Sequence, residues 1–182
     1  MSSPFVRPSN LVSQASMSVI TEIRIPSDDF ELGQILSLEQ ASAIELETLV
    51  PSGDATVPLF WVYEPVENGF LDTVERYPTV NSVTEVDAFD DRTLFRINWD
   101  ASQDHLFQCI LEHDGQILGA TGSPEGWNLE IRFSNREALS QCQDCCEDAH
   151  ISLKIIRIYN PTGPEAGQWY GLSEPQREAL TL

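Results

Sequence analysis

Cysteine and histidine cluster near the C-terminal third of the chain, where Cys142, Cys145, Cys146 and His150 spell C-x2-C-C-x3-H. Thiolate and imidazole are preferred zinc ligands, and neighbouring thiols can also exchange disulfides. The same positions form the inward stripe of a predicted helix, where cysteine behaves as a small apolar residue. No second ligand pair is visible, and Cys109 belongs to a different predicted helix. Core packing is therefore favoured, with redox sensing and metal binding as alternatives, and His150 is expected to face the helix-end carbonyls.

The remaining candidates for catalysis do not combine into a known arrangement. His105 and His113 flank one predicted helix, with no carboxylate or serine motif to complete a triad, so solvated histidines are expected. Adjacent acids that could suggest glycosidase or metal chemistry occur at Asp28/Asp29, Asp90/Asp91 and Glu147/Asp148. With 29 acidic residues such pairs are expected by chance. No phosphate loop, nucleophile elbow or HExxH motif occurs. We predict no catalytic, cofactor-binding or metal-binding residue, and no enzyme.

Aromatic residues lie on predicted strands, at Phe60, Trp61, Tyr63, Trp99 and Trp127. A sheet that binds RNA also displays aromatic side chains, but it displays basic residues beside them. Here the neighbours along the chain, such as Glu64, Asp100 and Glu130, are acidic. The sequence therefore favours packing in the core and between halves of the molecule.

The charge is strongly negative, with 29 Asp plus Glu against 10 Lys plus Arg and a net charge of -19, and Lys154 is the one lysine. Such a surface suits a protein dissolved in concentrated salt, which suggests a halophilic cytoplasm; an ordinary acidic surface is the alternative. It argues against nucleic-acid binding by this chain itself, because phosphate binding depends on clustered Lys and Arg. No apolar run reaches the ~18 residues of a membrane span, and no secretion signal occurs, so no membrane partner is expected.

Two segments share one order of predicted elements. In the first, strands are expected at 19–25, 42–50, 57–64 and 80–88, with helices at 30–36 and 66–77; a capping box at Asp28 and Glu31 begins the first helix. In the second, strands are expected at 93–99, 115–121, 127–133 and 151–158. The helices between them begin at Asp100 with Gln103 and at Ser134 with Glu137. Each segment is βαββαβ.

This repetition predicts an α+β protein of two tandem ferredoxin-like halves, at 17–90 and 91–158, each with an antiparallel sheet and both helices on one face. The open faces need cover, which the other half or a second chain in a homodimer can supply, and the two sheets are expected to pack together. A pocket between the halves would suit an effector, and the turns PSGDA at 51–55 and GSPEG at 122–126 are the expected places.

The ends differ from the middle. Residues 1–16 are rich in Ser and Pro without periodicity, which predicts a disordered leader. Residues 159–172 carry repeated Pro and Gly, which predicts a linker. Ser173 as N-cap, Pro175 in the first turn and Gln176 at the capping-box position then predict the start of a helix at 173–182.

The run YNPTGPEAGQWYGLSEPQREALTL resembles the junction between a regulatory domain and a helix-turn-helix domain in haloarchaeal regulators of the bacterio-opsin activator family. Weaker resemblance runs through PLFWVYE, LFRINWD and GSPEGWNLEIRF. Residues 177–182 would match the opening of that domain's first helix, and no recognition helix follows. The resemblance implies the GAF- and helix-turn-helix-associated regulatory domain of a transcription regulator, with its DNA-reading domain truncated.

Two functions follow as hypotheses. In the first, the chain is a regulatory domain that couples a small-molecule effector or a partner to DNA binding by the missing downstream domain. In the alternative, it is a freestanding protein that dimerises with full-length relatives and antagonises them. A small enzyme on a ferredoxin-like scaffold is a third hypothesis, for which the sequence contains no recognisable set of catalytic residues.

Overall fold

The computed structural model describes residues 17–36, 43–52, 55–63 and 69–161. Strands and helices follow the predicted order, βαββαβ twice. The first set is β1 Val19–Ile25, α1 Glu31–Ile35, β2 Ile44–Ser52, β3 Ala55–Tyr63, α2 Phe70–Glu75 and β4 Val80–Ala88. The second set is β5 Arg92–Trp99, α3 His105–Glu112, β6 Gln116–Ser123, β7 Gly126–Phe133, α4 Arg136–Asp148 and β8 Lys154–Tyr159. Short 3-10 turns at Ser27–Asp29 and Ala101–Gln103 precede α1 and α3.

The strands form one antiparallel sheet of eight, in the order β4-β5-β3-β2-β6-β7-β1-β8. The prediction of two sheets packed against each other is therefore wrong, although the α+β class holds. The element order was read correctly, but the tandem ferredoxin-like arrangement is not confirmed.

The two sequence halves exchange their first strands. A ferredoxin-like unit has the strand order fourth, first, third, second. The group β4-β5-β3-β2 has this order with β5 in the place of β1, and the group β8-β1-β7-β6 has it with β1 in the place of β5. Each group of four strands is thus completed by a strand from the other half of the sequence, so neither half has a complete sheet of its own.

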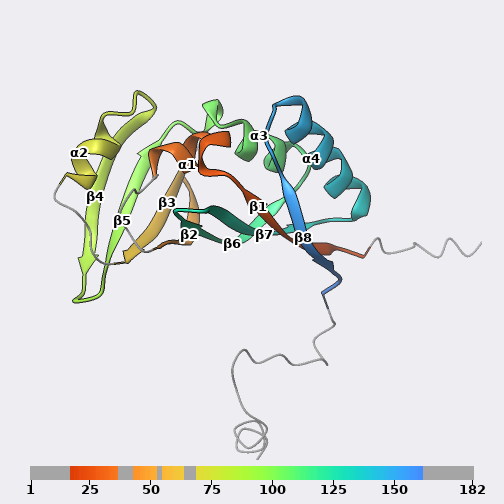
Figure 1. Cartoon of the computed structure of the whole chain (residues 1–182), viewed down its shortest axis with the longest axis horizontal. Coiled ribbons are helices and arrows are strands. Elements are labelled where there is room, and N and C mark those ends of the chain that lie inside the picture. Colours follow the sequence, from red (N-terminus) through yellow and green to blue (C-terminus); the bar gives the residue numbers. More distant parts are fainter. Residues whose placement is uncertain (1–16, 37–42, 53–54, 64–68, 162–182) are drawn as a thin grey trace, which may run out of the picture.

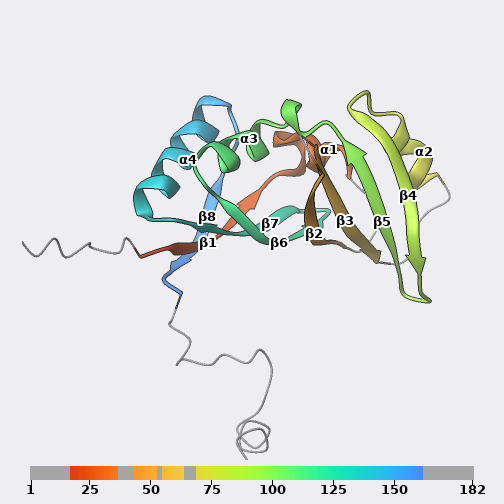
Figure 2. The same cartoon turned by 180° about the vertical axis from the view of Figure 1, so that it is seen from behind.

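All four helices lie on one face of the sheet (Figures 1 and 2). Alternation explains this, because inward residues of each strand are apolar. On β7, for example, Trp127, Leu129, Ile131 and Phe133 are buried, whereas Arg132 between two of them is exposed. The opposite face carries no helix among the described residues, and we call it the open face.

The residues that cap the helix N-termini differ from those predicted from the sequence. Asp104, and not Asp100, caps α3 by accepting hydrogen bonds from the amides of Leu106 and Phe107. Asp100 instead caps the 3-10 turn before it. Asn135, and not Ser134, caps α4. The capping box at Asp28 is not formed, since α1 begins without a side-chain cap.

Three predicted segments lie outside the residues that the structure describes. These are the leader at 1–16, the linker beyond 161 and the helix start at Ser173. The helix predicted at 66–77 is α2, which begins at Phe70, and the turn predicted at 51–55 is shorter because β2 continues to Ser52 and β3 begins at Ala55. No described helix has the length and apolar character needed to cross a membrane.

Candidate functional site

A short strand pairing joins the two groups of four strands at the centre of the sheet. β2 pairs with β6 only along Ile44–Leu46, opposite Ala120–Gly122. By contrast, β1 pairs with β7 along the whole of Val19–Ile25. Because few backbone hydrogen bonds cross this line, it is the place where the two groups can move relative to each other most easily. We call it the seam.

A hollow of about 390 Å³ lies over the seam. Gly119 of β6 forms part of its floor, and a Cβ added there would meet no atom within 4 Å. The absence of a side chain at this position therefore leaves the space open. The lining residues come from five strands: Glu22, Glu45, Leu46, Glu47, Leu118, Gly119, Ala120, Thr121, Asn128, Leu129, Glu130 and Arg157.

One wall of the hollow is formed by Glu45, Leu46 and Glu47 of β2, and side chains of the neighbouring strands β3 and β5 support it. The Tyr63 hydroxyl donates to Oε2 of Glu45 at 2.7 Å, which holds that carboxylate at the rim. The Arg92 guanidinium lies 4.6 Å from the centre of the Trp61 ring and donates to the Tyr63 hydroxyl at 3.4 Å. Those bonds raise the pKa of Arg92 further above its usual value, with the Tyr63 hydrogen bond as the main cause.

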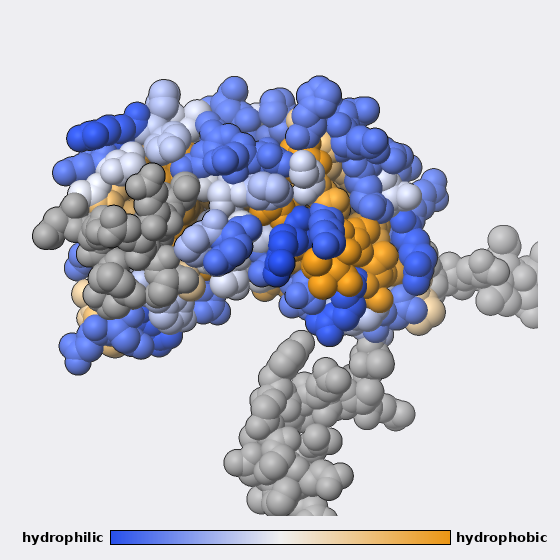
Figure 3. All heavy atoms as spheres, viewed as in Figure 1, coloured by the Kyte–Doolittle hydropathy of each residue, from blue (hydrophilic) through white to orange (hydrophobic). Residues whose placement is uncertain are grey.

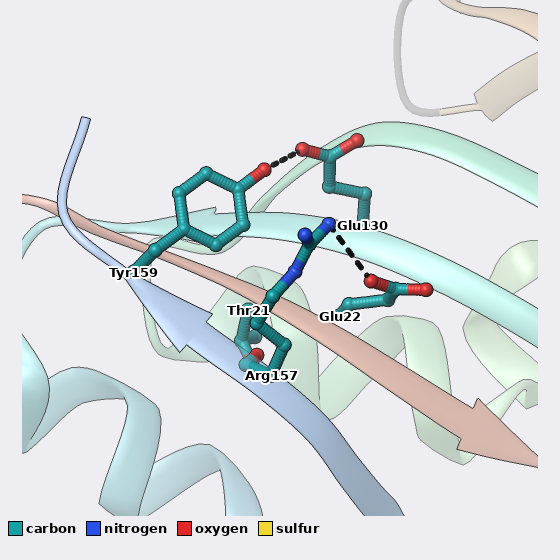
Figure 4. A network of polar contacts seen from close by, with 5 residues as sticks. All are labelled: Thr21, Glu22, Glu130, Arg157 and Tyr159. Atoms are coloured by element: carbon teal, nitrogen blue, oxygen red, sulfur yellow. Dashed lines mark hydrogen bonds and ion pairs between the residues drawn. The ribbon is translucent and has the colours of Figure 1, made fainter. Parts of the chain in front are cut away.

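The opposite wall is built by β7, β1 and β8 (Figure 4). The Tyr159 hydroxyl donates to Glu130, and Arg157 pairs with Glu22 at 3.1 Å while its guanidinium lies 5.0 Å from the Tyr159 ring centre. Thr21, beneath them, donates to the Arg157 carbonyl at 3.2 Å. Each wall thus has a glutamate that accepts a hydrogen bond from a tyrosine, and an arginine lies over the ring of that tyrosine. The three residues are Glu45, Tyr63 and Arg92 on one wall and Glu130, Tyr159 and Arg157 on the other.

The lining is rich in oxygen acceptors and negative on balance. Glu22, Glu45, Glu47 and Glu130 contribute four carboxylates, against one cation from Arg157. Asn128 adds an amide whose oxygen accepts from Nε of Arg24 at 2.9 Å. No lining residue is a histidine, cysteine or serine that could act as a nucleophile or an imidazole base. The arrangement suits recognition of a small polar ligand with a positively charged group.

The three cysteines of the predicted stripe are in two different states. Cys142 and Cys146 are buried free thiols, which confirms core packing for those positions. The hydrogen bond between them, followed by burial, raises the pKa of the Cys142 thiol. Cys145, which lies half-buried, is disulfide-bonded to Cys109 of α3. The sequence did not predict that bond, because it joins positions on two helices.

The histidines and paired acids are dispersed. His105 begins α3 and is exposed, whereas His113 at its end is half-buried, and its imidazole lies near Glu112 and Cys145 in a group whose ligand atoms are within 4.8 Å of one another. His150 follows α4 with φ 60°. Of the acidic pairs, Asp29 accepts from the Ser152 amide at 2.7 Å, which ties the turn before α1 to the chain after α4.

The aromatic prediction holds for three of the five residues. Phe60, Trp99 and Trp127 are buried. Trp61 and Tyr63 are half-buried on the open face, where Arg92 of the adjacent strand lies beside both rings.

The hollow lies near, but not at, the two turns where the sequence predicts an effector site. The turn at 122–126 connects β6 to β7 beside the hollow but supplies none of its lining, and the turn at 51–55 falls partly outside the described residues. The sequence prediction includes no ligand-binding role for Glu22, Glu130 or Tyr159. Their alternation on strands was the available signal, since it places them on the face opposite the apolar residues.

Residues 19–165 match the protein family described as the GAF and HTH_10 associated domain, BAT. No curated protein matches the chain. The family match begins at the first residue of β1 and ends shortly after β8. It therefore covers the entire sheet and all four helices.

Proposed function

The chain belongs to the family of GAF and HTH_10 associated (BAT) domains, and from that membership we propose that it is the regulatory domain of a helix-turn-helix transcription regulator. The domain binds an effector in the hollow over the seam and couples that binding to a DNA-binding domain downstream. The family match carries the proposal, since the domain is named for its association with helix-turn-helix domains. The chain itself is a binding and coupling element and performs no catalysis.

The position of β8 supports the coupling. The chain leaves the sheet from β8, whose last residue is Tyr159. Tyr159 donates to Glu130, which lines the hollow, and Arg157 of the same strand lines it directly. A ligand that binds these carboxylates therefore competes with contacts that hold the end of β8. Ligand binding thereby changes the position from which β8 leads into a downstream DNA-binding domain.

The seam supplies a second element that can take two positions. A ligand that contacts both Glu45 and Glu130 bridges the two groups of strands and stabilises one angle between them. A ligand shifts such an equilibrium only by its difference in affinity for the two states, and allosteric couplings are about 1–3 kcal/mol. That is enough for a roughly 5- to 150-fold change in DNA affinity.

Deletion of the gene that encodes this chain, followed by transcript sequencing, tests the proposed function. We expect a defined set of transcripts to change in the deletion strain and to return when the wild-type gene is restored. Growth in several carbon and nitrogen sources supplies different effector levels. A transcript profile identical to that of the parent strain in every medium would contradict a regulatory role.

The alternative function, dimerisation that antagonises full-length relatives, is favoured by one feature. β8 is an outer strand of the sheet, and Figure 3 shows an apolar area around its position, where Ile156 is 46% exposed. Exposed outer strands can pair with another chain. Light scattering in molar salt separates the alternatives: a dimer that Ile156→Lys converts to a monomer supports strand pairing, and a wild-type monomer excludes it.

A further inference from the structure

Four side chains with metal-binding atoms meet between α3 and α4, away from the hollow. Cys109, Glu112 and His113 have the spacing i, i+3, i+4, which places them on one side of α3 and its C-terminal end. Cys145 of α4 faces them, because it is bonded to Cys109 with the two Cα atoms 5.7 Å apart. Ligand atoms of Glu112, His113 and Cys145 all lie within 4.8 Å of one another.

The disulfide is one of two states that this group can adopt. A regulator of transcription meets DNA inside the cell, where thiols are kept reduced and disulfides are transient, so this step rests on the proposed function. Two molecules of a low-molecular-weight thiol supply two electrons and two protons and leave as their disulfide. The S–S bond breaks, and Cys109 and Cys145 each become a thiol.

We infer that reduction turns this disulfide into a binding site for a divalent metal of the zinc class, with Cys109, Cys145, His113 and Glu112 as its ligands. Two thiolates, one imidazole and one carboxylate form a donor set that zinc accepts with tetrahedral geometry. Calcium and magnesium prefer oxygen donors and are disfavoured by the sulfurs. Metal binding releases the two thiol protons.

The burial of the four residues suits a site that solvent can reach. Cys109 is buried, His113 and Cys145 are half-buried, and Glu112 is exposed. The metal therefore enters from the exposed Glu112 side and reaches the buried Cys109 sulfur last. Once bound, it links the same two helices that the disulfide links. Oxidation by a low-molecular-weight disulfide bonds the two sulfurs again and releases the metal, and the two small thiolates that leave take up two protons from water to become thiols.

The other two cysteines do not belong to this site. Cys142 and Cys146 are buried and hydrogen-bonded to each other. Neither sulfur is part of the group that Glu112, His113 and Cys145 form. Replacement of Cys142 by alanine therefore serves as a control for cysteine loss, and His105→Asn at the start of α3 serves as a control for histidine loss.

Metal titration of the purified protein in its two redox states tests the inference. One sample is reduced and desalted without oxygen, and the other is kept as the disulfide, with the state of Cys109 and Cys145 verified by peptide mass spectrometry. Cobalt(II) is added to each, because thiolate ligands give it a strong charge-transfer absorption, and zinc is then added to displace it. Thermal melting confirms that each variant is folded.

We expect the reduced protein to bind about one metal ion per chain with the thiolate absorption, and the oxidised protein to bind none. His113→Asn weakens binding by at least about tenfold, and Cys145→Ser removes most of the absorption, whereas Cys142→Ala and His105→Asn bind as the wild type does. Equal binding in both redox states, or a reduced protein that ignores His113→Asn, would overturn the assignment. Neither outcome bears on the transcript experiment, so the two proposals fail separately.

Discussion

Asp104 is a fully buried carboxylate that joins two helices. Its Oδ1 accepts from the amides of Leu106 and Phe107 at 3.0 and 3.2 Å, and its Oδ2 accepts from the Leu32 amide of α1 at 2.8 Å. Burial raises the pKa of this carboxyl above its usual value, although the amide hydrogen bonds oppose the shift. One residue thus begins α3 and anchors α1 against it.

Replacement of Asp104 by asparagine tests that role. Asparagine can keep the Oδ1 interactions of the cap, but it directs an NH2 group toward the Leu32 amide, and a buried donor is left without an acceptor. We expect a loss of about 1–3 kcal/mol in the free energy of unfolding. Urea unfolding measures it, with Asp100→Asn at the exposed cap as the control, for which a smaller loss is expected.

The pKa direction adds a pH dependence to the same comparison. Because the folded pKa of Asp104 lies above the unfolded value of about 3.9, its contribution to stability is fully present below that value and is lost as the pH rises through the folded pKa. The difference in unfolding free energy between wild type and Asp104→Asn should therefore shrink from about pH 4 to neutral pH. A difference that grows over this range contradicts the raised pKa.

Two glycines of β6 give a matched pair of substitutions. At Gly122 an added Cβ would lie 2.6 Å from the Trp127 ring, whereas at Gly119 it would meet nothing. We expect Gly122→Ala to lower the free energy of unfolding by about 1–3 kcal/mol and Gly119→Ala to change it by less than about 0.5 kcal/mol. A loss of about 1–3 kcal/mol for Gly119→Ala in thermal or urea unfolding would contradict the open space beside Gly119.

At the scale of residues, some roles can be predicted from the sequence and others cannot. The sequence predicts Cys142 and Cys146 as core residues, because their spacing matches one side of a helix. It favours Asp100 over Asp104 as the helix cap, because Gln103 follows at the capping-box distance. Asp100 caps the 3-10 turn Ala101–Gln103, and Asp104 caps α3. Because this turn lies between the two acids, α3 begins after Asp104 and not after Asp100.

At the scale of elements, the order of strands and helices could be predicted and their neighbours could not. Alternating apolar residues tell which face of a strand is buried, as on β7, and caps tell where helices begin. Neither signal says which strand lies next to which. β1 and β5 have similar alternating patterns, so each fits in the other's place, and their exchange leaves no trace in either pattern.

The seam makes a prediction about local stability. Because β2 and β6 pair only along Ile44–Leu46, their amides should open more readily than those of β1 and β7, which pair along Val19–Ile25. Hydrogen exchange followed by mass spectrometry should therefore show faster exchange in peptides from the seam, by about tenfold or more. Slower exchange at the seam than in β1 would exclude it as the line of movement.

At the scale of the whole molecule, charge is distributed unevenly. Most cations of the described residues lie on the open face, as the strand register shows for Arg24, Arg92, Arg96, Arg132, Lys154 and Arg157. The chain as a whole has a net charge of -19. The carboxylates therefore repel one another in dilute salt, and the open face is the less acidic side of the domain.

Salt should stabilise the protein for that reason. Screening shortens the Debye length from about 10 Å at 0.1 M to about 3 Å at 1 M, so repulsion in the folded state weakens. We expect the midpoint of thermal unfolding to rise by more than about 4 °C over this range of potassium chloride. A midpoint that stays constant or falls would argue against adaptation to concentrated salt.

The central claim is that regulation enters through the hollow over the seam, and the transcript profile of a strain carrying Gly119→Leu tests it most directly. The leucine fills the hollow without a clash at Cβ, and Thr84→Leu on the open face of β4, far from the hollow in strand order, is the matched control. With both proteins at wild-type abundance, Gly119→Leu should abolish the response of the regulated transcripts to the growth medium, and Thr84→Leu should preserve it. A normal response in the Gly119→Leu strain would contradict the account.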